Sequence, residues 1–223
     1  MKGILFKPWK IQFIAEHPDI ETQTRRVIKP QPPEGASIWR IEDGNTGESH
    51  FSVRRCNPWH TIKPRYQVGE TVYIKEALHR FCNKAIYKLD EQPVYFYRSL
   101  NPLYWRWQKN YLVPMHCPED AARYFIRILS IRAERLQEIT KEAILAEGVK
   151  YPVTEEGHLV LRLTGKCPPC DYIPKENFKN GTYAGDRATW LKAHFAALWD
   201  SINKAYPWES NPWVWVYGFN KCA

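Results

Sequence analysis

The sequence predicts an α+β fold in which short strands and short helices surround one core. Two observations carry this prediction: short runs alternate between apolar and polar residues, and other segments place apolar residues at helical spacing. The chain has 223 residues, of which 44% are hydrophobic, which suffices for one domain with a sizeable core or at most two small ones. Seventeen prolines against eleven glycines indicate many rigid loops and few long helices. A small mixed sheet or barrel spanning residues 1–223 is expected.

The N-terminal part predicts a strand, a short helix and a second strand. Residues 3–6 form a short apolar run, typical of a buried strand. Apolar residues from Ile11 to Ile14 then give one side of a short helix, which the "HPD" segment ends. The second strand is expected to begin at Val27 and to stop at Pro30.

The middle of the chain predicts three further strands. A turn at Gly69 leads into an apolar strand at 72–74. The segment "QPVYFYRS" (92–99) predicts another strand because it is rich in aromatic residues. The longest β-like run is "RYFIRILSIRAERLQEIT", where Ile126 and Ile128 point inward and Arg127 points outward.

The C-terminal part predicts two helices and a closing strand. Thr140 should cap a short helix that ends before Gly148. Residues 187–203 predict the longest helix, with one apolar face made of Leu191, Phe195, Leu198 and Ile202. The segment "NPWVWVYGF" then predicts a strand with bulky residues on both sides, as in a central sheet strand or a barrel strand.

Two loop-rich segments look inserted, at about 32–64 and 150–186. The first contains two candidate hairpin strands, "SIWRIE" and "HFSVRR". The second contains Cys167 and Cys170 in the pattern "CPPC", which is half of a structural zinc site. A rigid Pro-Pro turn is the alternative, because no second pair follows at short spacing. No cofactor is expected.

The net charge of the chain indicates what the protein binds more than how it folds. The formal net charge is +8 and the isoelectric point about 9.1, which favours nucleic acid first and an anionic small molecule second. An inert basic surface is the alternative. No apolar run approaches the roughly 18 residues that span a bilayer, and the N-terminus lacks the pattern of a signal peptide. A cytoplasmic protein without a membrane partner is therefore expected.

Five segments resemble one family when they are taken together and in order. They are "TQTRRVIKPQP", "VGETVYIKEA", "MHCPEDAAR", "RAERLQEITKEAILAEGV" and "LWDSIN" with "NPWVWVYGF". The chain thereby resembles the ASCH-domain proteins of phages and prophages, in the PUA-like superfamily. The resemblance implies a PUA-like mixed β-barrel with flanking short helices, the two insertions, and a cleft that binds RNA or a modified nucleotide. A phage-encoded protein would act in the cytoplasm of its bacterial host.

The resemblance also implies a possible hydrolase. A small bacterial relative is an acetylcytidine amidohydrolase, and a ribonuclease activity is attributed to the family. The catalytic Thr and Glu of the amidohydrolase fall on Thr24 and Glu147, and its Lys falls on Glu21. A glutamate cannot supply the cation that a lysine would bring beside the Thr hydroxyl. If Glu21 and Glu147 lie together, one of them tends to stay protonated.

The first of the five segments concentrates polar residues that suit an anion. If the segment is extended, Thr22, Thr24 and Arg26 share one face and Arg25 points the other way. Two hydroxyls and a guanidinium group could then hold a phosphate at the edge of a cleft, in a loop. The alternative is a polar strand end whose threonines reflect β-propensity or local turn bonding.

Four further candidates for a nucleic-acid or ligand site are Glu76, Trp105, His116 and Arg123. Glu76 would accept hydrogen bonds from a base edge, or else form a salt bridge. Arg123 would contact a phosphate or a carboxylate, and His116 would bind ligand or form a structural hydrogen bond. Trp105 lies in the basic and aromatic run "YWRWQK", which suits stacking on a single strand or packing as a flap. A protein-interaction module is the third function class, and it would expose an aromatic patch.

Overall fold

The computed structural model describes residues 1–34, 37–42, 48–52, 60–149, 178–179, 182–183 and 187–222. Cys167 and Cys170, the predicted zinc pair, lie outside these residues. Within the described residues, no three His, Cys, Asp or Glu side chains are grouped so that they could hold a metal ion. The chain divides into two compact units: the first comprises 1–20, 69–128 and 219–223, and the second comprises 21–68 and 129–218.

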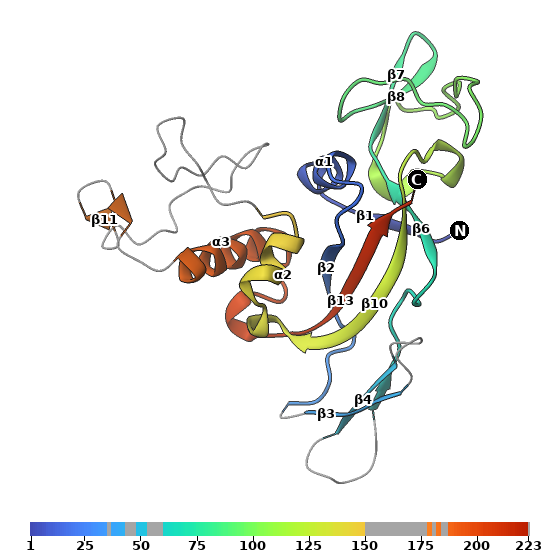
Figure 1. Ribbon diagram of the computed structural model, residues 1–223. Helices are drawn as coiled ribbons and strands as arrows, with labels where there is room; N and C mark the ends of the chain where they lie inside the picture. The colour runs from blue at the N-terminus through green and yellow to red at the C-terminus, as the bar shows by residue number, and fades with distance from the viewer. Residues whose placement is uncertain are drawn as a thin grey trace. The chain divides into compact units, whose positions relative to one another are not determined.

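The first unit is built around a strand pair near the N-terminus (Figure 1). Strand β1 (Gly3–Leu5) pairs in parallel with β6 (Thr71–Lys75), and β6 pairs antiparallel with the start of β10 (Phe125–Arg135). Before β6 the chain turns at Gly69, which has a φ of +82° and donates its N–H to the carbonyl of Ile128 at 2.8 Å. The predicted turn and strand are therefore confirmed. Helix α1 (Pro8–Glu16) has proline in its first turn, where no N–H is needed.

The first unit also contains a small three-stranded sheet. Its order is β8-β7-β9, with β7 at Leu78–Phe81, β8 at Lys84–Tyr87 and β9 at Tyr111–Leu112. Its inner face packs into a buried cluster of Leu78, Ala85, Tyr87, Val94, Leu103, Trp105, Leu112, Cys117 and Ala121. Two short 3₁₀ helices follow, η1 (Pro114–His116) and η2 (Glu119–Ala121). One face of this sheet is therefore committed to a core.

The second unit carries strands β2 (Thr22–Val27) and β13 (Trp213–Lys221), which neighbour each other in the order β10-β13-β2. The side chains of β13 are buried from Trp213 to Phe219, so the predicted central strand is confirmed. The remaining elements are β3 (Ser37–Glu42), β4 (Glu48–Ser52), β5 (His60–Ile62), η3 (Leu136–Glu138), α2 (Lys141–Ala146), β11 (Phe178–Lys179), β12 (Thr182–Tyr183), α3 (Arg187–Ile202) and η6 (Trp208–Ser210). The predicted hairpin is confirmed as β3 paired antiparallel with β4.

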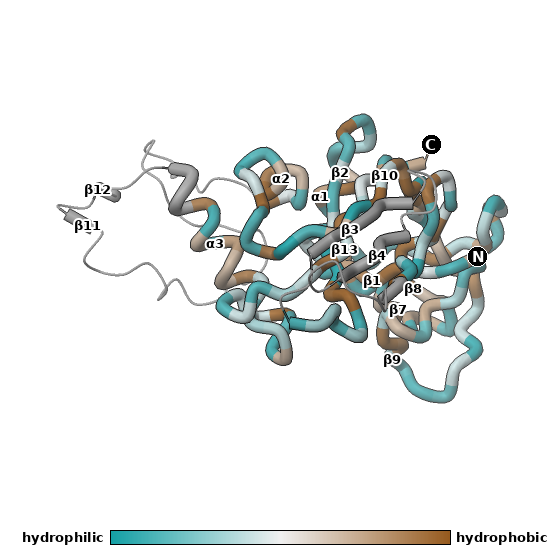
Figure 2. The backbone as a smooth tube through the Cα atoms, turned by 90° about the horizontal axis from the view of Figure 1, so that it is seen from below, coloured by the Kyte–Doolittle hydropathy of each residue, from teal (hydrophilic) through white to brown (hydrophobic). Residues whose placement is uncertain are grey.

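The two helices of the second unit follow their sequence signals. Thr140 Oγ1 accepts the N–H of Ala143 at 3.2 Å, and Gly148 has a φ of +84° just after α2. Both predicted ends are thus confirmed. Hydrophobic and hydrophilic stretches alternate along α3 (Figure 2). The predicted apolar face of α3 is buried except at its last residue, Ile202, which is exposed because the helix ends there.

Three predictions need correction. The stretch from Thr22 to Val27 is a strand and not a loop, so β2 begins five residues before the predicted start. The stretch 92–99 contains only isolated bridges, because Pro93 and Pro102 lack the N–H that a ladder requires. The mixed α+β class is confirmed, but the described strands of the main sheet form an open order, β1-β6-β10-β13-β2, and not a closed barrel.

His194 in α3 makes the stability of the protein sensitive to acid. The side chain is buried, and burial lowers its pKa below the ordinary value of about 6.5. The unfolded chain therefore binds the proton more readily, so stability is fully present above about pH 6.5 and is lost as the pH falls through the lower folded pKa. Between pH 7.5 and 5, urea titrations should show a smaller loss of stability for His194→Gln than for the unmodified protein. The difference is limited to about 1.4 kcal/mol per pH unit.

The exposed His116 provides the control. His116→Gln makes the same chemical change at an exposed position, and its pH profile is the reference for that of His194→Gln. An unchanged profile in His194→Gln would contradict this assignment.

Candidate functional site

The residues singled out from the sequence fall into two groups, one in each unit. The second unit holds Thr22, Thr24, Arg25, Arg26 and Glu147, and the first unit holds Glu76, Trp105, His116 and Arg123.

Arg25 lies at the centre of a buried ion-pair network. Its side chain is 1% exposed, and its Nε and Nη2 donate to Oε1 of Glu134 at 2.9 and 2.6 Å. Its Nη1 donates to Oε1 of Glu147 at 3.1 Å. Arg132 also pairs with Glu134, at 3.0 Å. These contacts give Arg25 and Glu147 a structural function, since each satisfies the other's charge away from water.

The other predicted anion-binding residues of β2 are buried or, in the case of Arg26, half-buried. Thr22 and Thr24 are buried. Burial lowers the pKa of the Arg26 guanidinium, while Tyr66, Glu147 and Tyr217 oppose that shift. Glu21 stands where the resemblance places the lysine of the amidohydrolase. It lies against Gly218, because a Cβ at this glycine would come within 2.7 Å of the Glu21 carboxylate.

Glu76 and Arg123 bind each other in the first unit. Arg123 donates to both carboxylate oxygens of Glu76, at 2.8 and 2.7 Å, and to Asp90 at 2.7 Å. Its Cζ also lies 3.8 Å from the centre of the Tyr87 ring. Burial raises the pKa of Glu76, and the hydrogen bonds from Arg123 oppose that shift. The predicted salt bridge of Glu76 is therefore present, and most donors of Arg123 are already engaged.

Trp105 and His116 occupy different environments. Trp105 belongs to the buried cluster of the first unit, and its Nε1 donates to the carbonyl of Lys109 at 3.1 Å. Its ring is thus core, while the adjacent Tyr104 is exposed. His116 is exposed at the end of η1. Neither residue lines the pocket of the first unit.

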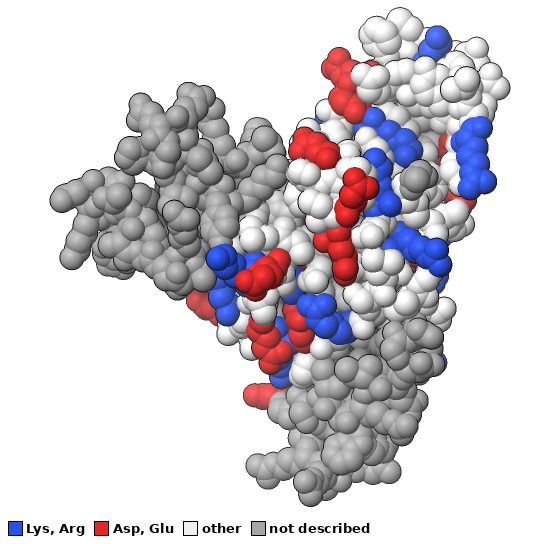
Figure 3. Space-filling view, viewed as in Figure 1, with Lys and Arg blue, Asp and Glu red and all other residues white. Residues whose placement is uncertain are grey.

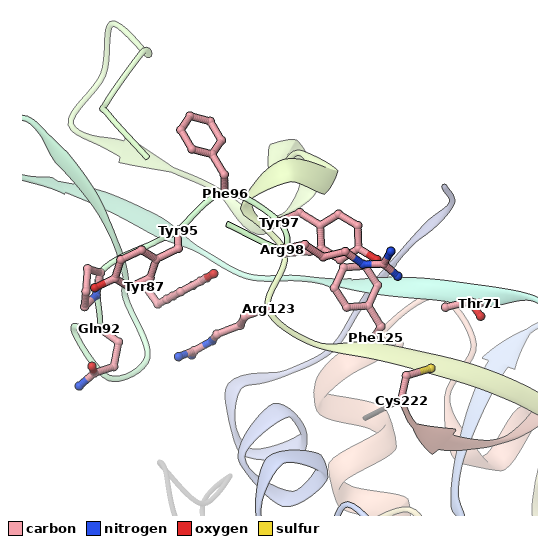
Figure 4. A pocket seen from close by; sticks show the side chains of 12 residues that line it. Thr71, Tyr87, Gln92, Tyr95, Phe96, Tyr97, Arg98, Arg123, Phe125 and Cys222 are labelled. Atoms are coloured by element: carbon pink, nitrogen blue, oxygen red, sulfur yellow. The ribbon is translucent and has the colours of Figure 1, made fainter. Parts of the chain in front are cut away.

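The first unit contains a pocket of about 660 Å³. Its walls are Thr71, Tyr87, Gln92, Pro93, Tyr95, Phe96, Tyr97, Arg98, Ala122, Arg123, Phe125 and Cys222. Tyr97, Arg98 and Phe125 lie together on one side, Tyr87, Gln92 and Tyr95 on the other, and Arg123 between them (Figure 4). Aromatic and basic side chains dominate these walls, and none of these described residues is acidic.

Arg98 is the cation of this pocket with the most freedom to bind an anion. It is exposed, and its Cζ lies 4.9 Å from the centre of the Tyr97 ring. Tyr97 in turn packs on Phe125, with ring centres 4.7 Å apart. Among the described side chains, none forms a salt bridge with Arg98. Arg98 was missed from the sequence, although the interleaved run "VYFYRS" is a usable signal.

Both signs of charge are interspersed on the face seen in Figure 3. In the part of the chain that the structure describes, no helix is long and apolar enough to cross a membrane. No protein-family model matches the chain, and neither a curated protein nor a solved structure matches it.

Proposed function

We propose that the protein is an ASCH-type, PUA-like protein that binds RNA or a modified nucleotide, and that the aromatic and basic pocket of the first unit receives the nucleotide. The single observation that carries the proposal is the composition of the pocket: five aromatic rings and two arginines among its described walls, without an acidic side chain. The volume of about 660 Å³ lies within the range of small-ligand sites.

The aromatic walls suit the base. Tyr95 is exposed, so its ring is available to stack on a base in the pocket, whereas the exposed Phe96 ring points away from the other pocket side chains (Figure 4). Tyr87 is instead fixed by the hydrogen bond from its hydroxyl to the carbonyl of Ala121, at 2.9 Å. A rigid inner wall and an accessible ring favour a flat ligand.

The two arginines of the pocket have different roles in binding a polar group. Arg123 is held by Glu76 and Asp90, so it shapes the pocket and leaves few donors for a ligand. Arg98 can offer its guanidinium fork to a phosphate or to a base edge. The phosphate contact predicted for Arg123 therefore passes to Arg98 in this proposal.

Replacing Arg98 by alanine tests the assignment. With a fluorescein-labelled, 12-nucleotide single-stranded RNA, Arg98→Ala should weaken binding about tenfold, the equivalent of about 1.4 kcal/mol. The slope of log affinity against log salt should become shallower by about 0.7, because one phosphate contact to a single strand is lost. The control is Lys7→Ala, which removes an exposed cation of the same unit whose side chain caps no helix. Equal affinities of Arg98→Ala and Lys7→Ala would contradict the site.

Hydrolysis remains the second prediction, and the geometry offers it less support. Thr24 and Glu147 are both buried, and Glu147 is paired with Arg25. A carboxylate that already neutralises a buried guanidinium is poorly suited to take a proton from a threonine. Unchanged turnover of acetylcytidine or RNA in a Thr24→Ala, Glu147→Gln variant would exclude this mechanism.

A further inference from the structure

The outer face of the small sheet β8-β7-β9 carries aromatic and basic side chains. Directly opposed residues share a face, and His79 opposes Tyr111 while Phe81 opposes Lys84. Tyr104 joins this face through its bridge to Lys84. The buried cluster lies on the other face, to which Leu78, Ala85, Tyr87 and Leu112 point. We call His79, Phe81, Lys84, Lys88, Tyr104 and Tyr111 the outer face.

The exposure of its aromatic rings is unusual for a solvent-facing sheet surface. Phe81 is 62% exposed, Tyr104 61% and Tyr111 42%. A sheet with one buried face normally presents polar side chains on the other. A group of large exposed rings instead marks a surface that contacts a partner.

The charges on the outer face identify the partner. Lys84 and Lys88 are exposed, and Lys88 Nζ lies 4.8 Å from the centre of the Tyr111 ring. Neither lysine forms a salt bridge with a described residue. The segment 78–112 contains six Lys or Arg residues against two acidic ones. Its surface, at the top of Figure 3, is mostly uncharged, with basic side chains on and beside it and an acidic group at its left edge.

Accessible rings interleaved with unpaired cations suit single-stranded nucleic acid, because bases stack on the rings while the cations follow the phosphates. We infer that the outer face is a stacking platform that binds nucleotides of a single strand beyond the one in the pocket. The inference rests on the proposed function for the identity of the strand, but it assigns a separate surface. A protein partner is the alternative occupant of these rings, and the absence of RNA binding would identify it.

Two ring substitutions and two RNA lengths test the platform. Phe81→Ala and Tyr104→Ala should each weaken binding of a labelled 12-nucleotide RNA about tenfold, given the usual contribution of a stacked base. Neither should change the affinity for a single ribonucleotide, the shorter of the two RNA ligands, which the pocket alone accommodates. Arg98→Ala should weaken the binding of both ligands. The control is Met115→Ala, which removes a side chain of similar exposure, 63%, outside the outer face.

The outcomes separate the two proposals. If the ring variants bind the 12-nucleotide RNA as the unmodified protein does, the platform is overturned and the pocket stands. If the ring variants lose affinity while Arg98→Ala does not, the pocket is overturned and the platform stands. If the unmodified protein binds neither RNA, both proposals fail, and the rings belong to a protein interface.

Discussion

Replacing Arg25 by alanine should destabilise the second unit by about 3–5 kcal/mol, the usual cost of leaving a buried charge without its partner. Arg25 is 1% exposed and holds both Glu134 and Glu147. Without it, two carboxylates remain close together and away from water, and their repulsion adds to the loss of hydrogen bonds. Urea unfolding at pH 7 should show the loss directly.

Arg132→Ala is the matched control for Arg25→Ala. Arg132 pairs with the same Glu134, but its side chain is 40% exposed. Water can replace this partner, so the expected loss is below about 1 kcal/mol. If the two variants were equally stable, the buried network would not have the structural function assigned to it.

Replacing Glu76 by alanine should cost about 3 kcal/mol, because it leaves the Arg123 guanidinium with one partner instead of two. Glu76 is 2% exposed and accepts two hydrogen bonds from Arg123. The freed guanidinium would also change the shape of the pocket, so RNA affinity should fall as well. Thermal unfolding and RNA binding of the same preparation measure both effects.

Asp90→Ala distinguishes a local effect from a general loss of charge. Asp90 contacts the same guanidinium, but it is 39% exposed. Its removal should cost less than about 1 kcal/mol and should leave RNA affinity near that of the unmodified protein. If Asp90→Ala lost as much stability as Glu76→Ala, burial of the carboxylate would not determine how much each partner of Arg123 contributes.

The elements predicted correctly from the sequence are those with a strong local signal. The period of two in β10, the cap at Thr140 and the turn at Gly69 each depend on a few neighbouring residues. Strand β2 was placed too late because its polar residues suggested a strand end or a loop. Arg25 is buried there only because Glu134 and Glu147, more than 100 residues away, neutralise it. No local sequence pattern predicts partners so far away in the chain.

The pocket was missed for a related reason. Its walls come from residues 71 to 125 and from Cys222, and the segment 92–98 adopts no regular strand. Arg98 has a φ of +58°, which breaks the alternation that a strand would have imposed. The sequence did indicate aromatic and basic interleaving near Trp105. Only the structure, in which Tyr104 bridges to Lys84 of β8, shows that Tyr104 is exposed and Trp105 is core.

The most direct test of nucleic-acid binding is the fluorescence anisotropy of a labelled 12-nucleotide single-stranded RNA, titrated with the unmodified protein across a salt series. Saturable binding that weakens as salt rises is expected, with log affinity falling linearly with log salt, at about 0.7 per phosphate contact. Competition by unlabelled single-stranded RNA should exceed that by duplex DNA, because stacking requires accessible bases. Absence of binding at low salt would contradict the account and leave the aromatic surfaces of the first unit to a protein partner.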